Sequence, residues 1–430
     1  MTVDVIGAGL AGCECAYQLS KRGIKVRLFE CKPTCKSPAH HENTYAELVC
    51  SNSLKSDDIS TASGLLKAEL RKLDSLLIKI ADDVKVPAGS ALAVDRELFT
   101  QKVTEYIRND ANIEVIPGVV DDWDENKPTV IATGPLTVGP LADKISQKFG
   151  GNLHFFDAAA PIISGDSIDY SSAFVGDRYG RGTGDYVNCP LNREEYAAFY
   201  SALVSAERAK LHEFEKNDVF EGCMPVEVMA ARGVDTLRFG PMRPVGFKTD
   251  SGEKPYAVLQ LRRENAAGDM FNLVGFQTNL TFPEQKRVFS LIPALKNAEF
   301  LRYGVMHRNS FINAPKTINA YFQVKSIPKT FIAGQLSGVE GYVESIASGL
   351  MCGINAAKSL NGEPLVRLPA TTIIGALCGY LESENADFQP MNANFGILPP
   401  LENKTRDKAK NKLLYGERSL KDLGKVIGYV

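Results

Sequence analysis

The first thirty residues carry the pattern that most constrains the fold of this chain. Residues 2–6 favour a strand, a helical pattern follows, and residues 25–29 favour a second strand, so the segment is a complete βαβ unit. Between the first strand and the helix stands the motif GxGxxG, formed by Gly7, Gly9 and Gly12.

The spacing of these glycines is typical of a dinucleotide-binding turn. The first permits the tight turn, the second lets the backbone approach a pyrophosphate, and the third lets the helix pack on the strand. The helix N-terminus offers unpaired N–H groups to phosphates, and an acidic residue about 20 positions further on can accept hydrogen bonds from a ribose. The alternative is a glycine-rich turn without a ligand. The residues predicted to bind are Gly7, Ala8, Gly9, Leu10, Ala11, Gly12 and Glu30.

The composition is that of an ordinary globular protein long enough for two or more domains. The chain has 430 residues, 44% of them hydrophobic and 23% charged, which excludes disordered, collagen-like and disulfide-scaffold classes. The formal net charge of -2 gives no global attraction to nucleic acid or membranes, so a polyanionic partner must meet a local basic patch. The N-terminus lacks a signal-peptide pattern, and nine cysteines, an odd number, indicate reduced thiols. We therefore expect a cytoplasmic protein.

Further along the chain, strands and helices continue to alternate, except in a middle region at residues 186–303 where the pattern changes. Residues 33–63 form a long polar stretch, and loops of this length are usually functional or disordered. An apolar strand ends in Thr133-Gly134, and another ends in Gly334-Gln335, as in flavoproteins with two dinucleotide folds. We expect a Rossmann-like α/β domain in two parts, residues 1–185 and 304–430, with an inserted α+β domain at residues 186–303.

Two cysteines lie where a thiol could be reactive. Cys50 ends the polar stretch, and Cys223 lies between Gly222 and Pro225, which bend the chain around it. A thiol held at a turn can be exposed and deprotonated, as a nucleophile must be, although a buried inert cysteine fits the spacing equally well. No metal site is expected, because the cysteines and histidines near residue 35 do not complete a zinc-binding pattern.

Several segments together resemble one family. VIGAGLAG, SPAHH, AELVCSNSLKSD, VPAGSALAVDRE, FEGCMPVEVMAARG, LRFGPMRPVG, YGVMHRNSFINAP and AGQLSGVEGYVESIASGL occur in family order over nearly the whole chain and look like the TrmFO family of folate- and FAD-dependent tRNA (uracil-5-)-methyltransferases. The resemblance implies the glucose-inhibited-division type of two-dinucleotide fold. It also implies FAD as cofactor, 5,10-methylenetetrahydrofolate as carbon donor, and NADH or NADPH as a transiently bound electron donor.

The resemblance also implies roles for particular residues. Cys223 would add to carbon 6 of a uridine in the T-loop of tRNA, and Cys50 would remove the proton from carbon 5. His307 could stack on the folate or hydrogen-bond to it. The FAD contacts would be Gly7, Ala8, Gly9, Leu10, Ala11, Gly12, Glu30, Thr133, Gly134, Gly334, Gln335, Gly341 and Tyr342.

The RNA partner calls for cations and aromatic side chains, because a stacked uridine must be splayed out before a thiol reaches it. Arginines at positions 232, 238, 243, 262, 263, 302 and 308 could supply the cations. Four alternatives stay open: a wobble-uridine flavoprotein, which would be longer, the same chemistry on ribosomal RNA, a small-molecule FAD oxidoreductase, and a non-catalytic RNA-binding protein.

Overall fold

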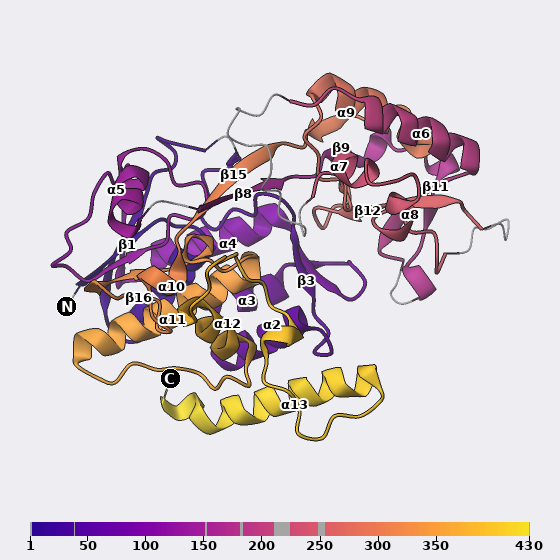
Figure 1. The fold of residues 1–430 in the computed structure, drawn as a ribbon. Coiled ribbons are helices and arrows are strands. Elements are labelled where there is room, and N and C mark those ends of the chain that lie inside the picture. The colour runs from indigo at the N-terminus through magenta and orange to yellow at the C-terminus, as the bar shows by residue number, and fades with distance from the viewer. Residues whose placement is uncertain are drawn as a thin grey trace.

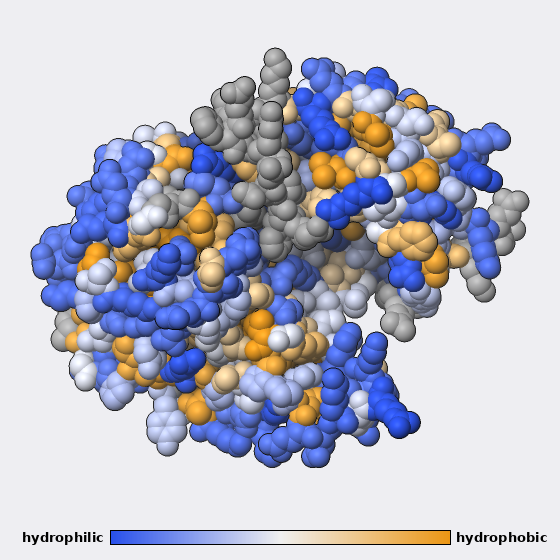
Figure 2. All heavy atoms as spheres, viewed as in Figure 1, coloured by the Kyte–Doolittle hydropathy of each residue, from blue (hydrophilic) through white to orange (hydrophobic). Residues whose placement is uncertain are grey.

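The computed structural model describes residues 2–37, 39–150, 153–180, 184–209, 224–247 and 254–429, and these form two lobes (Figure 1). The larger lobe contains both ends of the described chain. Figure 2 shows that the surface is hollowed between the two lobes. The candidate site lies in the larger lobe, on the side where the second lobe contacts the chain at residues 51 and 52.

The larger lobe is built on a six-stranded sheet of the order β16-β17-β7-β1-β2-β6. Five strands run parallel and β16 is antiparallel to β17, which gives the α/β architecture that the sequence predicts. In chain order the strands are β1 (Thr2–Ile6), β2 (Lys25–Glu30), β6 (Ile113–Pro117), β7 (Thr129–Ile131), β16 (Gln323–Val324) and β17 (Ile327–Ile332).

Two helices from opposite ends of the chain pack closely in this lobe. They are α1 (Leu10–Lys21) and α11 (Tyr342–Asn361). A Cβ at Gly349 would lie 2.2 Å from the Ala11 carbonyl oxygen, so only glycine allows this approach. No helix in the described part of the chain is both long and apolar enough to cross a membrane.

The remaining helices of the larger lobe are α2 (Ala62–Lys72), α3 (Leu76–Asp83), α4 (Arg96–Asn109), α5 (Pro140–Phe149), α10 (Ala314–Thr317), α12 (Ile373–Glu382) and α13 (Lys408–Val426). Apolar residues recur at helical spacing between positions 64 and 80, and they belong to two helices, α2 and α3. Asp74 between them has a positive φ of 58°, and the side chain of Ser75 caps α3 by accepting from the Ile78 N–H. The turn breaks the helix while the apolar side chains on both sides stay in one core.

A small sheet and a two-stranded ribbon carry the chain toward the second lobe. The small sheet contains β3 (Ser53–Ser56), β4 (Lys85–Val86) and β5 (Ala91–Val94). The ribbon pairs β8 (Leu153–Ala158) with β15 (Met306–Phe311) in antiparallel orientation. Because β8 leads into the second lobe and β15 leads out of it, the ribbon is the covalent connection between the lobes.

The second lobe is a sheet of the order β10-β11-β12-β13-β9-β14 with a core of its own. Its strands are β9 (Ile162–Ser164), β10 (Phe174–Val175), β11 (Tyr186–Leu191), β12 (Ala257–Arg263), β13 (Met270–Leu273) and β14 (Phe300–Arg302), and its helices are α6 (Arg193–Ser205), α7 (Val226–Ala230), α8 (Thr236–Phe239) and α9 (Phe282–Phe289). β9 and β10 precede residue 186, where the sequence placed the start of the insertion. We therefore propose that the inserted domain runs from β9 to β14.

Candidate active site

A deep pocket lies at the carboxyl ends of β1, β2, β7 and β17. Most residues predicted to bind a cofactor line it, although they come from four separate parts of the sequence: Gly7, Ala8, Gly9, Leu10, Ala11, Glu30, Thr133, Gly134, Gly334, Gln335 and Tyr342. Cys50 and His307 line the same pocket, together with Asp157 and Asn309. Gly12 and Gly341 do not line it, but a Cβ at either position would overlap a neighbouring atom, so both turns require glycine there.

The glycine turn between β1 and α1 leaves room for a ligand at one position only. A Cβ on Gly7 would lie 2.6 Å from the Ala132 carbonyl oxygen, and a Cβ on Gly12 would lie 1.8 Å from the Gly7 oxygen. A Cβ on Gly9 would meet nothing within 4 Å, so Gly9 faces open space in the pocket. Gly9 is also the N-cap of α1 and provides no side-chain cap, so the first N–H groups of the helix remain available to phosphate oxygens.

Glu30 is fixed beside this turn at the end of β2. Its carboxylate accepts from the Ala8 N–H at 2.8 Å and from the Lys32 N–H at 2.9 Å. The side chain is buried, and its remaining lone pairs face the pocket that a ribose would enter. The glycine turn and this carboxylate together fit a dinucleotide such as FAD.

The N-terminus of α11 reaches the opposite part of the pocket. Gly341 takes a φ of +118°, and a Cβ there would lie 2.3 Å from a Glu344 carboxylate oxygen. Tyr342 and Ser345 from the first turn line the pocket. The helix dipole at this end favours a negatively charged group, such as the ring system of a reduced flavin.

Cys50 is held by groups from several elements. The Tyr342 hydroxyl lies 2.9 Å from the Cys50 Sγ and accepts from the Cys50 N–H at 2.7 Å. Arg96 of α4 donates to the Leu48 carbonyl oxygen at 2.6 Å. Burial, with the nearby charge of Asp157, raises the pKa of Cys50 to about 12. The thiol is therefore protonated at neutral pH and can serve as a base only when a ligand changes its surroundings.

The second lobe also holds the Cys50 segment. Arg262 of β12 donates to the Asn52 Oδ1 at 2.9 Å and to the Ser51 Oγ at 2.8 Å. Arg96 forms an ion pair with Glu264 across the same boundary, at 2.8 Å. Both pairs are largely buried, so the position of Cys50 depends on how the two lobes meet.

His307 on β15 completes the pocket near the polar stretch. Burial lowers its pKa to about 4, with the charges of Arg302 and His40 contributing, so the ring is neutral at physiological pH. Its Nε2 atom is buried and has no hydrogen-bond partner among the described residues. A neutral, unpaired imidazole facing the pocket suits contact with a bound heterocycle.

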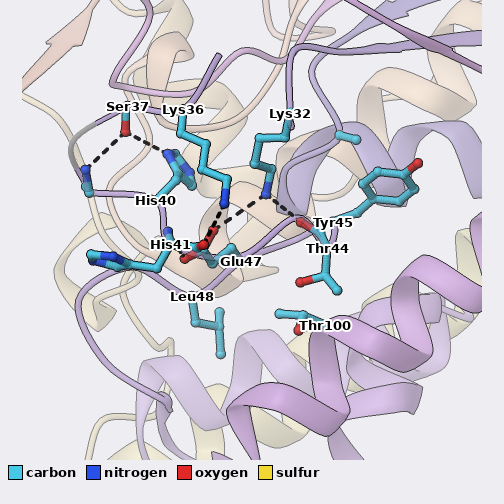
Figure 3. A network of polar contacts seen from close by, with 12 residues as sticks. Lys32, Lys36, Ser37, His40, His41, Thr44, Tyr45, Glu47, Leu48 and Thr100 are labelled. Atoms are coloured by element: carbon cyan, nitrogen blue, oxygen red, sulfur yellow. Dashed lines mark hydrogen bonds and ion pairs between the residues drawn. The ribbon is translucent and has the colours of Figure 1, made fainter. Parts of the chain in front are cut away.

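Several residues of the polar stretch line the pocket, among them Ser37, His40 and Glu47, and they take part in a network of polar contacts (Figure 3). The buried Lys32 lies 3.6 Å from the Glu47 carboxylate and also donates to the Thr44 carbonyl oxygen. Glu47 in turn accepts from the His41 N–H at 2.8 Å, and the His40 ring is bonded to the Ser37 hydroxyl at 2.7 Å. The network explains how so polar a segment can be buried against the pocket, because its charged groups are paired.

Comparison with known proteins places the chain in a family. The model of the family described as glucose inhibited division protein A matches residues 2–364. A protein of Acetivibrio thermocellus named methylenetetrahydrofolate–tRNA-(uracil-5-)-methyltransferase TrmFO is 56% identical over 424 residues, which are 98% of this chain and 97% of that protein. The chain belongs to the TrmFO family. A relative of the same name from Natranaerobius thermophilus is 55% identical over 99% of both chains.

A solved structure agrees with the TrmFO assignment at the level of the fold. GidA of Aquifex aeolicus, in its form II crystal, superposes on all of this chain and on 74% of its own, with a TM-score of 0.72 and 16% sequence identity. The glucose-inhibited-division type of fold that the sequence predicts is thereby confirmed.

The second cysteine of the TrmFO pattern, Cys223, lies outside the described residues. The described chain resumes at Met224, and α7 follows. Glu227 in α7 is buried and accepts from the Asn279 N–H at 2.8 Å and from the Thr278 hydroxyl at 2.9 Å. The segment that follows Cys223 is thus anchored to the core of the second lobe.

Sequence reasoning missed Asp157, which lines the pocket, and Arg96 with its ion-pair partner Glu264, which hold the Cys50 segment from outside it. It also gave Arg262 a different role. Arg96, Asp157 and Glu264 stood out in no pattern, since each acts through a partner far away in the sequence. Arg262 was expected among the RNA contacts, but it is buried and bound to Ser51 and Asn52. Only the position of Arg96 inside the family segment VPAGSALAVDRE could have drawn attention to it.

Proposed function

We propose that this chain forms 5-methyluridine in the T-loop of tRNA, with 5,10-methylenetetrahydrofolate as carbon donor and reduced FAD as reductant. The observation that carries the proposal is a single pocket in which a dinucleotide cradle, the Cys50 thiol and the neutral His307 face one another. Relatives that bear the methyltransferase name align with this chain from end to end, so the pocket and the inserted domain are both included.

The cofactor would be held by the glycine turn, by Glu30, and by the turns at Thr133-Gly134 and Gly334-Gln335. When bound, FAD supplies the electrons that reduce the transferred carbon to a methyl group, and NADH or NADPH would restore those electrons. The N-terminus of α11 contributes a positive potential beside it. His307 is proposed to contact the folate, because its uncharged ring can stack on a flat heterocycle.

The two cysteines would act in sequence on the uracil ring. Addition of the Cys223 thiolate to carbon 6 turns the ring into an enolate and makes carbon 5 nucleophilic, as carbon 5 of free uracil is not. After carbon 5 has bonded to the folate methylene, Cys50 would remove the carbon 5 proton, and the bond to the folate nitrogen would break so that tetrahydrofolate leaves. Reduction of the remaining methylene to methyl would then release Cys223 from carbon 6. Tyr342 and Arg262 hold the Cys50 segment in place for this step.

A cytoplasmic location remains part of the proposal. It rests on the eight described cysteines, which are all free thiols, as expected in a reducing compartment.

Trapping with RNA that contains 5-fluorouridine tests the proposed function. Fluorine at carbon 5 cannot leave as a proton would, so an enzyme that adds a thiolate to carbon 6 should form a stable adduct, visible as a band shift in a denaturing gel. The adduct should disappear in Cys223→Ala and persist in Cys50→Ala. A Cys223→Ala variant that still traps RNA would contradict the assignment of the nucleophile.

Methyl transfer identifies the substrate. Labelled methylenetetrahydrofolate and NADPH are supplied with unmodified tRNA or ribosomal RNA transcripts, and the modified position is mapped. Product in the T-loop is expected. Product only in ribosomal RNA would change the target and keep the chemistry, and no product on either would favour a small-molecule oxidoreductase.

A further inference from the structure

One exposed aromatic residue of the second lobe is held in an unusual backbone conformation. Tyr179 has a φ of 62° and a ψ of 19°, which is the left-handed region that bulky side chains rarely enter. The residue is nonetheless 55% exposed, so burial of its ring in a core does not explain the conformation. Strain of this kind persists when the surrounding structure imposes it, and it is often found where function requires it.

The ring of Tyr179 packs against the backbone at Gly246. The Tyr179 N–H donates to the Gly246 carbonyl oxygen at 2.8 Å. A Cβ at Gly246 would lie 3.0 Å from the ring atoms Cε1 and Cζ of Tyr179 and 2.7 Å from the Cγ of Arg178. Glycine at this position therefore lets the ring rest against the chain, and the ring is fixed instead of swinging in solvent.

Arg178 locks the same turn from the other side. Its guanidinium donates to the carbonyl oxygens of Arg243 and Val245, at 2.8 and 2.9 Å, and lies 4.5 Å from the centroid of the Phe247 ring. Tyr179 is thus part of a built platform, made of two chain segments that are about 65 residues apart in sequence.

The platform is positively charged at its edge. Arg243 is exposed, and Arg178 donates to its carbonyl oxygen at 2.8 Å, so two arginines stand on neighbouring segments of the platform. An exposed aromatic ring beside a cation is the arrangement that binds an unpaired nucleotide, with the base on the ring and the phosphate at the cation. The chain as a whole carries a formal charge of -2, so this local charge is not a consequence of composition.

The platform lies on the same face of the second lobe's sheet as Arg262, which binds the Cys50 segment. Arg178 also donates to the Gln260 side-chain oxygen at 3.2 Å. Gln260 and Arg262 are alternate residues of β12, so their side chains share one face and lie about 7 Å apart along the strand. Arg262 binds Ser51 next to Cys50. Side-chain contacts through Gln260 and Arg262 therefore connect the platform to Ser51, the residue next to Cys50.

We propose that Tyr179 stacks against an unpaired base of the tRNA that flanks the target uridine, and that Arg243 binds the adjoining phosphate. The inference rests on the proposed function. A uridine that leaves its stack exposes the faces of neighbouring bases, and an aromatic side chain at a fixed position replaces the lost stacking. The platform thus selects an RNA loop over a continuous duplex.

Binding of tRNA to three variants tests the proposal, with fluorescence anisotropy as the measurement. Tyr179→Ala should weaken binding about ten-fold or more, whereas Tyr179→Phe should bind like the wild type, because the ring is kept. Arg243→Gln should weaken binding and reduce the slope of log affinity against log salt by about 1. Tyr170→Ala, at an equally exposed tyrosine of the same lobe, is the matched control and should bind normally.

Thermal unfolding separates this role from a structural one. Tyr179→Gly relieves the left-handed strain, so its melting temperature should equal or exceed that of the wild type while tRNA binding is lost. If Tyr179 had only a structural role, Tyr179→Gly would have a lower melting temperature, and its folded form would bind tRNA like the wild type.

An abasic scan of the T-loop identifies the stacked base. At one position flanking the target, removal of the base should weaken binding to the wild type and leave binding to Tyr179→Ala unchanged, because the interaction is already absent. Equal losses for both proteins at every position would overturn the proposal. If the wild type methylates tRNA and Tyr179→Ala binds tRNA with full affinity, the platform is overturned and the proposed function stands. A wild type that binds no tRNA overturns the proposed function as well.

Discussion

The hydroxyl group of Tyr342 binds Cys50 twice, since it accepts from the backbone N–H at 2.7 Å and lies 2.9 Å from the thiol sulfur. With the N–H as donor, the hydroxyl proton can be directed at the sulfur, where it stabilises the thiolate. The same tyrosine begins α11, which packs closely on α1 in the larger lobe. One side chain therefore positions the proposed base and lowers the Cys50 pKa that burial raises.

Replacement of Tyr342 by phenylalanine tests this control of acidity. Loss of the hydroxyl should raise the pKa of Cys50 above its present value of about 12, since a hydrogen bond to the thiolate is removed. The rate of alkylation of Cys50 at a given pH, measured by peptide mass spectrometry, should fall roughly ten-fold. The exposed Cys35 is an internal control whose rate should not change. Faster alkylation of Cys50 would show that Tyr342 mainly shields it.

Two glycines of the same turn should respond differently to replacement by alanine. In Gly12→Ala the new Cβ would overlap the Gly7 carbonyl oxygen, so we expect a loss of stability on the order of 3 kcal/mol. In Gly9→Ala the Cβ enters open pocket space, so the apoprotein should keep its melting temperature while the affinity for FAD falls. Flavin fluorescence and thermal unfolding measure the two effects. A Gly9→Ala variant with normal FAD affinity would exclude phosphate binding at this turn.

The buried imidazole of His307 should make stability depend on pH in a defined window. Its pKa is about 4 in the folded chain against 6.5 ordinarily, so the unfolded chain takes up the proton first as the pH falls. The free energy of unfolding should therefore decrease between pH 6.5 and 4, and His307→Gln should remove part of that decrease. Urea unfolding at several pH values measures the difference. Parallel pH profiles for both proteins would contradict the burial of a neutral ring.

Arg262 should act on Cys50 and not on RNA. Arg262→Ala leaves the Oδ1 of the fully buried Asn52 without its donor, which costs about 1–3 kcal/mol of stability. Methyl transfer should fall, while the affinity for tRNA and its salt dependence should stay the same. Arg263→Ala, one residue further along β12, is the control for stability, because its side chain points to the other face of the strand. A reduced salt slope in Arg262→Ala would restore the RNA role that the sequence suggested.

The extent to which sequence predicted the site differs between its parts. The glycine turn, Glu30 and the two later turns were predicted because each is a local pattern of strand, glycine and helix, and they meet at one pocket. Cys50 was singled out at the end of a polar stretch, but spacing could not distinguish a reactive thiol from a buried one. Its contacts come from residues 292 and 211 positions away, and no local pattern contains such partners.

The sequence by itself determined the dinucleotide fold and its family, since both depend on short segments whose residues fit one backbone geometry. Tertiary structure decided what the charged and reactive side chains do. It paired Arg262 with the Cys50 segment, buried His307 in neutral form and seated Tyr179 on Gly246. These outcomes depend on which distant side chains share a small volume and how much water is excluded there, and both are properties of the folded chain.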